Sequence, residues 1–290
     1  MESVKRRKIR AFDVFLALLM TVLAFCFIIP FWIIFVTSLS DNLQLMRNGI
    51  SLWFQGFTWR GYEFLFQISD KFLRSMGVSL LTSVVTAVLS VFTCTLAAYA
   101  LSKKYLVGRK FFNIFLMIPM FFSGGTIPTY LIVRGIGLYN TVWALILPGA
   151  TSVYQILLMR NYFYGITDAL EEAAYLDGAG DLAVLWRIYL PLSVPMMCTI
   201  GCMTFVGKWN EWLPSLLYIG AGKEHLWTVQ YVLRQMLQDM KTLIGDEVAN
   251  APTIAAQNAA IVLVVLPLIL LSPILHKYFS AGLTVGSVKG

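Results

Sequence analysis

The chain has 290 residues, of which 58% are hydrophobic and only 13% are charged, and its mean hydropathy is +0.74. A soluble domain is about half apolar and about a quarter charged, so this composition excludes an ordinary soluble protein and indicates one that lies in a bilayer. The net charge of +7 comes from short basic clusters beside apolar runs, a pattern that marks membrane topology rather than a nucleic-acid surface.

Six apolar runs are long enough to cross about 30 Å of hydrocarbon. Each must be helical, because backbone N–H and C=O groups have no water partners inside a bilayer. The sequence therefore predicts an all-α integral membrane protein with six transmembrane helices and both termini on one side. The runs cover residues 12–39, 76–101, 111–133, 139–159, 192–219 and 256–279.

The first run follows a basic stretch at residues 5–10. It is too long for the core of a signal peptide and has no small-residue cleavage site, so it is predicted to be an uncleaved first span. With a cytoplasmic N-terminus, thirteen Lys and Arg fall in inner segments and eight in outer ones. This asymmetry predicts cytoplasmic N- and C-termini and a cytoplasmic segment at residues 161–191.

Two outer segments are long, and both suggest surface roles. Residues 40–75 are rich in Trp and Phe, which favours the outer membrane interface. Residues 220–255 contain an amphipathic helix at about 226–244, which either rests on the membrane or forms a platform for an outer partner. The predicted organisation is an N-terminal part (1–75), a permease core (76–279) and a C-terminal tail (280–290).

The sequence contains no pattern for catalysis or metal binding. A Walker A motif, HExxH and GxSxG are all absent, and the chain has two histidines. All four cysteines fall in predicted spans; Cys198 and Cys202 share a helix face, but two thiols alone make a poor zinc site. We expect a protein that is not an enzyme and that binds no metal or cofactor itself.

The polar segment at residues 161–191 interrupts the apolar chain. Thr167 or Asp168 can cap a helix there, and acidic side chains in its first turns suit the helix dipole. Gly178 can end that helix in the left-handed conformation that other residues avoid. A second short helix is predicted over residues 181–190, leading into the next span.

The same segment carries a spaced motif. Glu172-Ala173-Ala174 is followed after three residues by Gly178, after nine more by Ile188, and then by Leu190-Pro191. This pattern resembles the EAA loop of bacterial ABC-importer permeases at every position and spacing. An incidental amphipathic loop between two helices is the alternative.

Other stretches resemble the carbohydrate-uptake permeases of maltose-type and oligosaccharide importers, including a branch associated with complex polysaccharide fragments. The resemblance covers nearly the whole chain and is weakest over residues 40–70. The matching stretches are residues 95–101, 124–130, 145–149, 209–212 and 282–290.

The resemblance implies a type I (MetI-like) permease fold in the bacterial plasma membrane. Such a chain forms half of an alternating-access pathway for a sugar or oligosaccharide. The implied partners are a second homologous permease, an extracytoplasmic solute-binding protein and an ABC ATPase dimer that binds the ATP and Mg²⁺. A permease for a non-sugar solute and a standalone secondary carrier are the alternative functions, and no nucleic-acid partner is expected.

In that family the EAA loop forms a coupling helix that docks on the ATPase. The resemblance makes residues 168–178 the docking element, with Glu172 the expected polar contact, Ala173 and Ala174 allowing close approach, and Gly178 setting the bend. The expected coupling residues are Asp168, Glu171, Glu172, Ala173, Ala174, Asp177, Gly178, Ile188, Leu190 and Pro191.

The fifth apolar run contains ionisable side chains, which inside a membrane usually face a bundle interior or an aqueous path. Lys208 and Glu211 are three residues apart and can pair on one helix face. Trp209 and Trp212 offer indoles that can stack on sugar rings, with packing inside the protein, the commoner role of aromatic residues in spans, as the alternative. The set Lys208, Trp209, Asn210, Glu211 and Trp212 therefore indicates either part of the pathway or a subunit interface, and the sequence does not choose between them.

Overall fold

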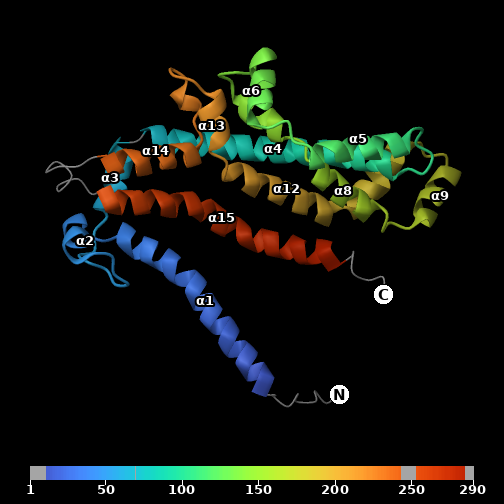
Figure 1. Ribbon diagram of the computed structural model, residues 1–290. Coiled ribbons are helices and arrows are strands. Elements are labelled where there is room, and N and C mark those ends of the chain that lie inside the picture. The colour runs from blue at the N-terminus through green and yellow to red at the C-terminus, as the bar shows by residue number, and fades with distance from the viewer. Residues whose placement is uncertain (1–10, 69, 243–252, 285–290) are drawn as a thin grey trace. The chain divides into compact units, whose positions relative to one another are not determined.

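The computed structural model describes residues 11–68, 70–242 and 253–284 (Figure 1). The regular structure of these residues is helical apart from one isolated antiparallel bridge between Ser40 and Phe57, so the all-α prediction is confirmed for them. Two compact units can be distinguished, Met1–Ser69 with Met236–Leu263 and Asp70–Gln235 with Val264–Gly290. The domain boundaries predicted at residues 75 and 279 stay predictions.

The first unit holds α1 (Ala11–Ser38), α2 (Asn42–Asn48) and α3 (Arg60–Ile68). The second holds α4 (Asp70–Ser102), α5 (Arg109–Phe121), α6 (Thr126–Gly135), α7 (Val142–Ile146), η1 (Leu147–Gly149), α8 (Val153–Phe163), α9 (Asp168–Leu176), α10 (Asp181–Val184), the π-helix η2 (Leu185–Tyr189), α11 (Leu190–Leu192), α12 (Val194–Trp209), α13 (Leu213–Tyr218) and η3 (Glu224–Leu226). Both units share α14 (Val229–Thr242) and α15 (Thr253–Thr284).

Some predicted features lie outside the described residues. They are the basic stretch at residues 5–10, the last two residues of the amphipathic helix predicted at 226–244, and most of the tail from residue 282. Residues 229–242 of that amphipathic helix are present as α14, which begins three residues later than predicted because Leu226 ends the short helix η3.

Within the described parts of the chain, three helices, α1, α4 and α15, are each long and apolar enough to cross a membrane without a break. Three further candidates are bent, by 114° between α5 and α6, by 47° between α7–η1 and α8, and by 76° between the α10–α11 segment and α12. Counting each bent pair as one span gives up to six, which agrees with the sequence prediction. The exact number of spans and the side of the termini stay predictions.

The bends and breaks interrupt the helices predicted over residues 111–133, 139–159 and 192–219, each of which the sequence predicts as one helical run. Gly125 has φ 86°, a left-handed value that favours glycine, and it separates α5 from α6. Pro148 lies in η1, where its missing N–H weakens continuation of α7. The last run breaks again after Trp209, where α12 ends before α13 begins.

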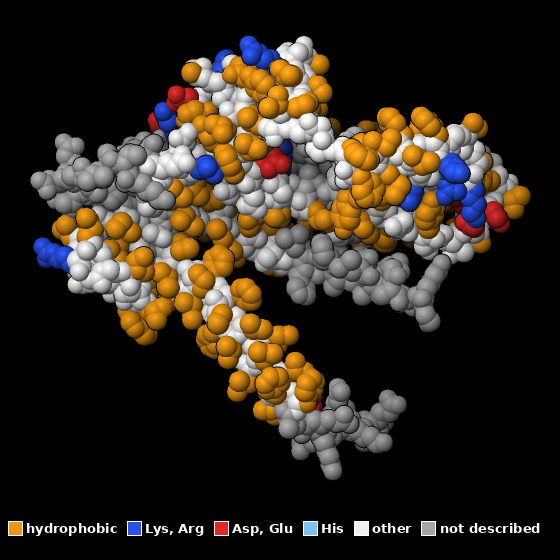
Figure 2. Space-filling model, viewed as in Figure 1, with side chains coloured by type: hydrophobic (Ala, Val, Ile, Leu, Met, Phe, Trp, Pro, Cys, Tyr) orange, Lys and Arg blue, Asp and Glu red, His pale blue; other side chains and the backbone are white. Residues whose placement is uncertain are grey.

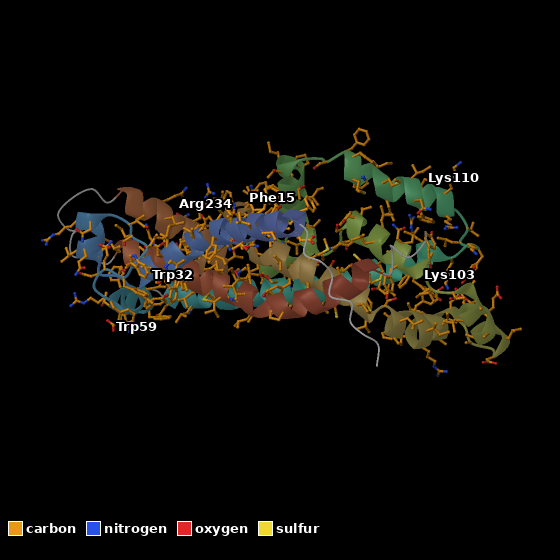
Figure 3. The ribbon with its side chains drawn as sticks, turned by 90° about the horizontal axis from the view of Figure 1, so that it is seen from below. Phe15, Trp32, Trp59, Lys103, Lys110 and Arg234 are labelled. Carbon is orange, nitrogen blue, oxygen red and sulfur yellow. The ribbon has the colours of Figure 1, made fainter. Side chains whose placement is uncertain are left out.

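In the first unit, the large apolar side chains of α1 are exposed along most of its length, as orange atoms in Figure 2 show. A helix with apolar side chains all round is suited to lipid or to another apolar surface. Near its C-terminal end, Trp32 of α1 begins a series of contacting aromatic rings that runs through Phe54 to Tyr62, with neighbouring centroids 5.7 to 6.5 Å apart (Figure 3). Their predicted place at the outer interface stays a prediction.

The core of the second unit forms where α4 packs between α8 and α12. The buried face of α4 is rich in Ser, Thr and Ala, which lets membrane helices approach closely. Gln155 of α8 joins the three helices: its Oε1 accepts a hydrogen bond from Ser90 Oγ at 2.8 Å, and its Nε2 donates to Thr204 Oγ1 at 2.9 Å. Buried amides need such partners, so the network fixes how these helices meet.

Thr204→Val is expected to lower the free energy of unfolding by about 1 kcal/mol, because it leaves the Gln155 amide without its α12 partner. Thr199→Val is the matched control, since that buried hydroxyl donates only to Pro195 O of its own helix. Thermal unfolding in one detergent checks this. Equal destabilisation by the two variants would contradict it.

Candidate functional site

The helix α9 forms where the sequence predicts it, but its N-terminus is not capped as expected. Thr167 occupies the N-cap position in an extended conformation and makes no side-chain cap hydrogen bond. The Asp168 carboxylate instead accepts a hydrogen bond from Lys104 Nζ at 2.8 Å, which lowers the pKa of Asp168 below its usual value. Both side chains of this pair are largely exposed, so solvent screens it and it stabilises the fold little.

The C-terminal bend of α9 is confirmed at Gly178. Its φ is 82°, in the left-handed region, and its N–H donates to Tyr175 O at 3.0 Å. The next N–H, of Ala179, donates to Ala174 O at 2.9 Å and satisfies a second carbonyl of the last turn. The chain can reverse here because glycine adopts this conformation at no steric cost.

The helix predicted at residues 181–190 is less regular than expected. It consists of α10, the π-helix η2 and α11, so one turn is wider than an α-helical turn. Ile188 and Leu190 of the motif are partly buried and pack against the core of the second unit, while Pro191 lies in the first turn of α11. In this structure Ile188 and Leu190 thus help to pack the core, and Pro191 helps to set where α11 begins.

The two faces of α9 differ in exposure. Glu171 and Ala174 are half-buried against the unit, whereas Glu172, Ala173 and Asp177 are exposed. Leu176 is 90% exposed and lies one turn beyond Glu172 on the same outward face. Sequence reasoning did not single out Leu176, although its spacing from Glu172 carried the signal.

Inward, the Glu171 carboxylate meets a buried ammonium. Lys103, which directly follows α4, is 6% exposed, and its Nζ lies 2.7 Å from Glu171 Oε1. The same Nζ lies 4.1 Å from the ring centroid of Tyr99 and 4.5 Å from that of Tyr189, so two aromatic faces cover the cation. The Tyr189 hydroxyl donates to Glu171 Oε2 at 2.5 Å. The sequence analysis used Lys103 only to orient the chain and did not predict this cluster.

The electrostatics of Glu171 follow from these contacts. Burial raises the pKa of its carboxyl, but the ammonium of Lys103 and the hydroxyl of Tyr189 outweigh burial and leave the pKa below its usual value. Since the folded pKa is below the unfolded one, the resulting stability is present above the unfolded pKa and is lost as pH falls through the folded pKa. The Glu171 carboxyl is thus ionised at neutral pH.

A second polar contact holds the far end of α9. The hydroxyls of Tyr105 and Tyr175 both donate to Asp181 Oδ1, the first at 2.5 Å. Burial and the hydrogen bond to Asp181 raise the pKa of Tyr175, so its hydroxyl stays protonated as a donor. Charged side chains gather at the end of the unit that holds α9. They are coloured blue and red in Figure 2, and Figure 3 labels Lys103 at the same end.

The residues at 208–212, predicted to line the pathway or a subunit interface, differ in burial. Lys208 and Trp209 are buried, whereas the three residues after them are partly or fully exposed. Lys208 Nζ lies 2.6 Å from Glu211 Oε2, so the predicted pair is present, although α12 ends at Trp209 and Glu211 follows it outside the helix. Trp209 is 1% exposed and donates from Nε1 to Val264 O at 3.1 Å, so in this structure its indole packs inside the unit, which is the packing alternative of the sequence analysis. A large apolar ring with one polar N–H fits a buried site when that N–H has a partner.

Trp212 is only partly buried, and its ring contacts a cation that the sequence analysis did not predict. The guanidinium of Arg234, on α14, lies 3.8 Å from its ring centroid. Beside this pair, Gln230 Nε2 donates to Asn210 Oδ1 at 3.2 Å. Among the described residues, no carboxylate lies within ion-pair distance of Arg234. The side chains in this region are a stacked cation, two amides and the paired Lys208 and Glu211.

Comparison with known proteins identifies the chain. Residues 90–285 match the family described as the inner membrane component of binding-protein-dependent transport systems. The chain belongs to this family. It is therefore the membrane-embedded permease of an ABC importer.

Individual relatives match along almost their whole length. Protein LplC of Bacillus subtilis is 39% identical over 286 residues, covering 97% of this chain and 96% of the relative. The polygalacturonan/rhamnogalacturonan transport system permease protein YtcP of the same organism is 32% identical, covering 98% and 100%. A bacterial ABC transporter involved in import of the acidic polysaccharide alginate contains a chain with a TM-score of 0.84 and 29% identity, covering 92% of this permease and 96% of that chain.

Gly178→Ala is expected to destabilise the permease by about 1–2 kcal/mol, because alanine strains the left-handed conformation although no neighbour would touch its Cβ. Gly180→Ala is the control, since Gly180 has φ −83° and equally open surroundings. Thermal unfolding and amide hydrogen exchange of residues 168–178 check this. Equal effects of the two variants would contradict a conformational role.

Proposed function

We propose that this permease forms half of the translocation pathway of an oligosaccharide importer and docks on a separate ATPase through α9. The observation that carries the proposal is the division of α9 into two faces. One face is held to the permease by Glu171, and the other presents Glu172, Ala173 and Leu176 to solvent. An exposed apolar side chain between small and acidic residues suits a partner's cleft.

The energy source must come from another chain. The sequence has no Walker A motif, whose backbone amides and lysine hold the phosphates of ATP. ATP and Mg²⁺ are therefore expected in an ABC ATPase dimer. A second permease would complete the pathway, and a solute-binding protein would deliver the cargo from outside. Alternating access would arise as the two permeases rock against each other.

The cargo is proposed to be an acidic oligosaccharide. Two similar proteins are named for polygalacturonan or rhamnogalacturonan transport and for alginate import, and these polymers carry carboxylates. In this chain, Arg234 offers a guanidinium free of acidic partners among the described residues, stacked on Trp212. A guanidinium binds a carboxylate through paired hydrogen bonds, and an indole face suits a sugar ring. We propose that Trp212 and Arg234 contact the cargo along the pathway.

Glu172→Lys is expected to reduce co-purification of the ATPase by about tenfold or more, because it reverses the charge on the outward face of α9. Leu176→Asp should act in the same direction by placing a charge in an apolar contact. The control is Glu63→Lys, the same charge change at an exposed site on α3. Wild-type retention of the ATPase by both α9 variants would refute docking through this face.

Arg234→Gln is expected to raise the KM for uptake of oligogalacturonate by about tenfold, the loss of one charge-assisted contact. Uptake of the methyl-esterified oligosaccharide, which lacks the charge, should change little. Arg134→Gln is the control, because its guanidinium also lies over a ring, that of Tyr139. Reconstituted importer in proteoliposomes provides the assay. Equal changes for both oligosaccharides would argue against carboxylate recognition by Arg234.

A further inference from the structure

The attachment of α9 to its unit depends on few contacts. No residue of α9 is fully buried, and the Lys104–Asp168 pair beside it is exposed on both sides. A glycine lies in the turn on each side of the helix, Gly165 before it and Gly178 after it. Because glycine gives the backbone conformational freedom, these turns alone hold the direction of the helix weakly.

Glu171 is the exception, since only 16% of its side chain is exposed. Its two carboxylate oxygens go to different elements. Oε1 pairs with Lys103 at the end of α4, and Oε2 accepts the hydroxyl of Tyr189 at the end of η2. A single carboxylate therefore links α9 to the long span α4 and to the segment that leads into α12.

The rings around Lys103 reinforce this link. Tyr99 of α4 and Tyr189 of η2 lie 5.0 Å apart, edge to face, and both contact Phe163 at the end of α8. The Tyr99 hydroxyl also donates to Asp181 O, at the start of α10, at 2.9 Å. The ends of α4, α8 and the α10–η2 segment thus meet around one ammonium, and Glu171 adds α9 to them.

We propose that Lys103 and Glu171 are positioning residues that join α9, α4 and η2 into one mechanical body. A displacement of α9 then moves two spans with it instead of being absorbed by its glycine turns. This rests on the proposed function of α9 as the docking element. The two adjacent glutamates then have different roles: Glu171 holds α9 to the permease, and Glu172 faces the ATPase.

The test uses the assembled importer in lipid nanodiscs, with Lys103→Met, Glu171→Gln and the double variant. Each single variant leaves a buried group without its charged partner, whereas the double variant leaves no unpaired charge and is expected to fold. The stimulation of ATP hydrolysis by the binding protein should fall about tenfold in all three, with the ATPase still bound. Because the two residues act as one pair, the double variant should be no worse than either single variant.

Amide hydrogen exchange of residues 168–178, measured on the full permease alone, provides a readout independent of the ATPase. Exchange should speed up about tenfold in the double variant, because α9 opens more often without its link. Lys110→Met, which removes an exposed charge from α5 at the same end of the unit, is the control and should leave both readouts unchanged (Figure 3).

Two results would overturn the inference. One is wild-type exchange and wild-type ATPase stimulation in the double variant. The other is loss of the ATPase with unchanged exchange, which would make Glu171 a docking residue. Failure of the wild-type permease to retain any ATPase would instead refute the proposed function, and the exchange of the permease alone would still decide whether the pair holds α9.

Discussion

A positive charge inside a membrane protein must be neutralised where it lies, and the ammonium of Lys103 meets that requirement at the end of α4. One carboxylate and two aromatic faces surround it, and they come from α9, α4 itself and η2. The position of α9 depends on this requirement, because its other contacts are mostly exposed. The acidic residue that neutralises Lys103 belongs to the same helix whose other face, with Glu172 and Leu176, is exposed.

The two conspicuous charge pairs of the second unit have different surroundings. Lys103–Glu171 joins distant parts of the chain and is largely shielded, so its geometry is specified. Lys208–Glu211 joins residues three apart, one in the last turn of α12 and one just beyond it, and leaves the carboxylate half-exposed. The first kind of pair fixes how several helices meet, and the second neutralises a buried ammonium within one short stretch of chain. Arg234 is held differently again, with its guanidinium stacked on the ring of Trp212.

Much of the architecture follows from local rules that a sequence displays. Apolar run length predicts the helical spans, and Gly178 predicts the bend after α9, because both depend on neighbouring residues alone. The partner of Glu171 could not be predicted, since Lys103 lies 68 residues away and only the packing of α4 brings it there. The burial of Trp209 could not be predicted either: an indole suits stacking on a sugar ring, but the packing of distant parts of the chain buries this one. The bends in the spans could not be predicted, because the sequence does not show which of its glycines and prolines interrupt a helix.

The π-helix η2 lies between Gly178 and Pro191, so the number of residues in this stretch determines which way the side chains beyond it point. Each residue added to or removed from a helix rotates everything beyond it by about 100°. A deletion in η2 would therefore swing Tyr189 away from the Glu171 carboxylate, even if every remaining side chain were kept. Substitutions in this stretch change individual contacts, but insertions and deletions change which residues face each other. The spacing of the motif is thus a structural constraint in its own right, separate from the identity of its residues.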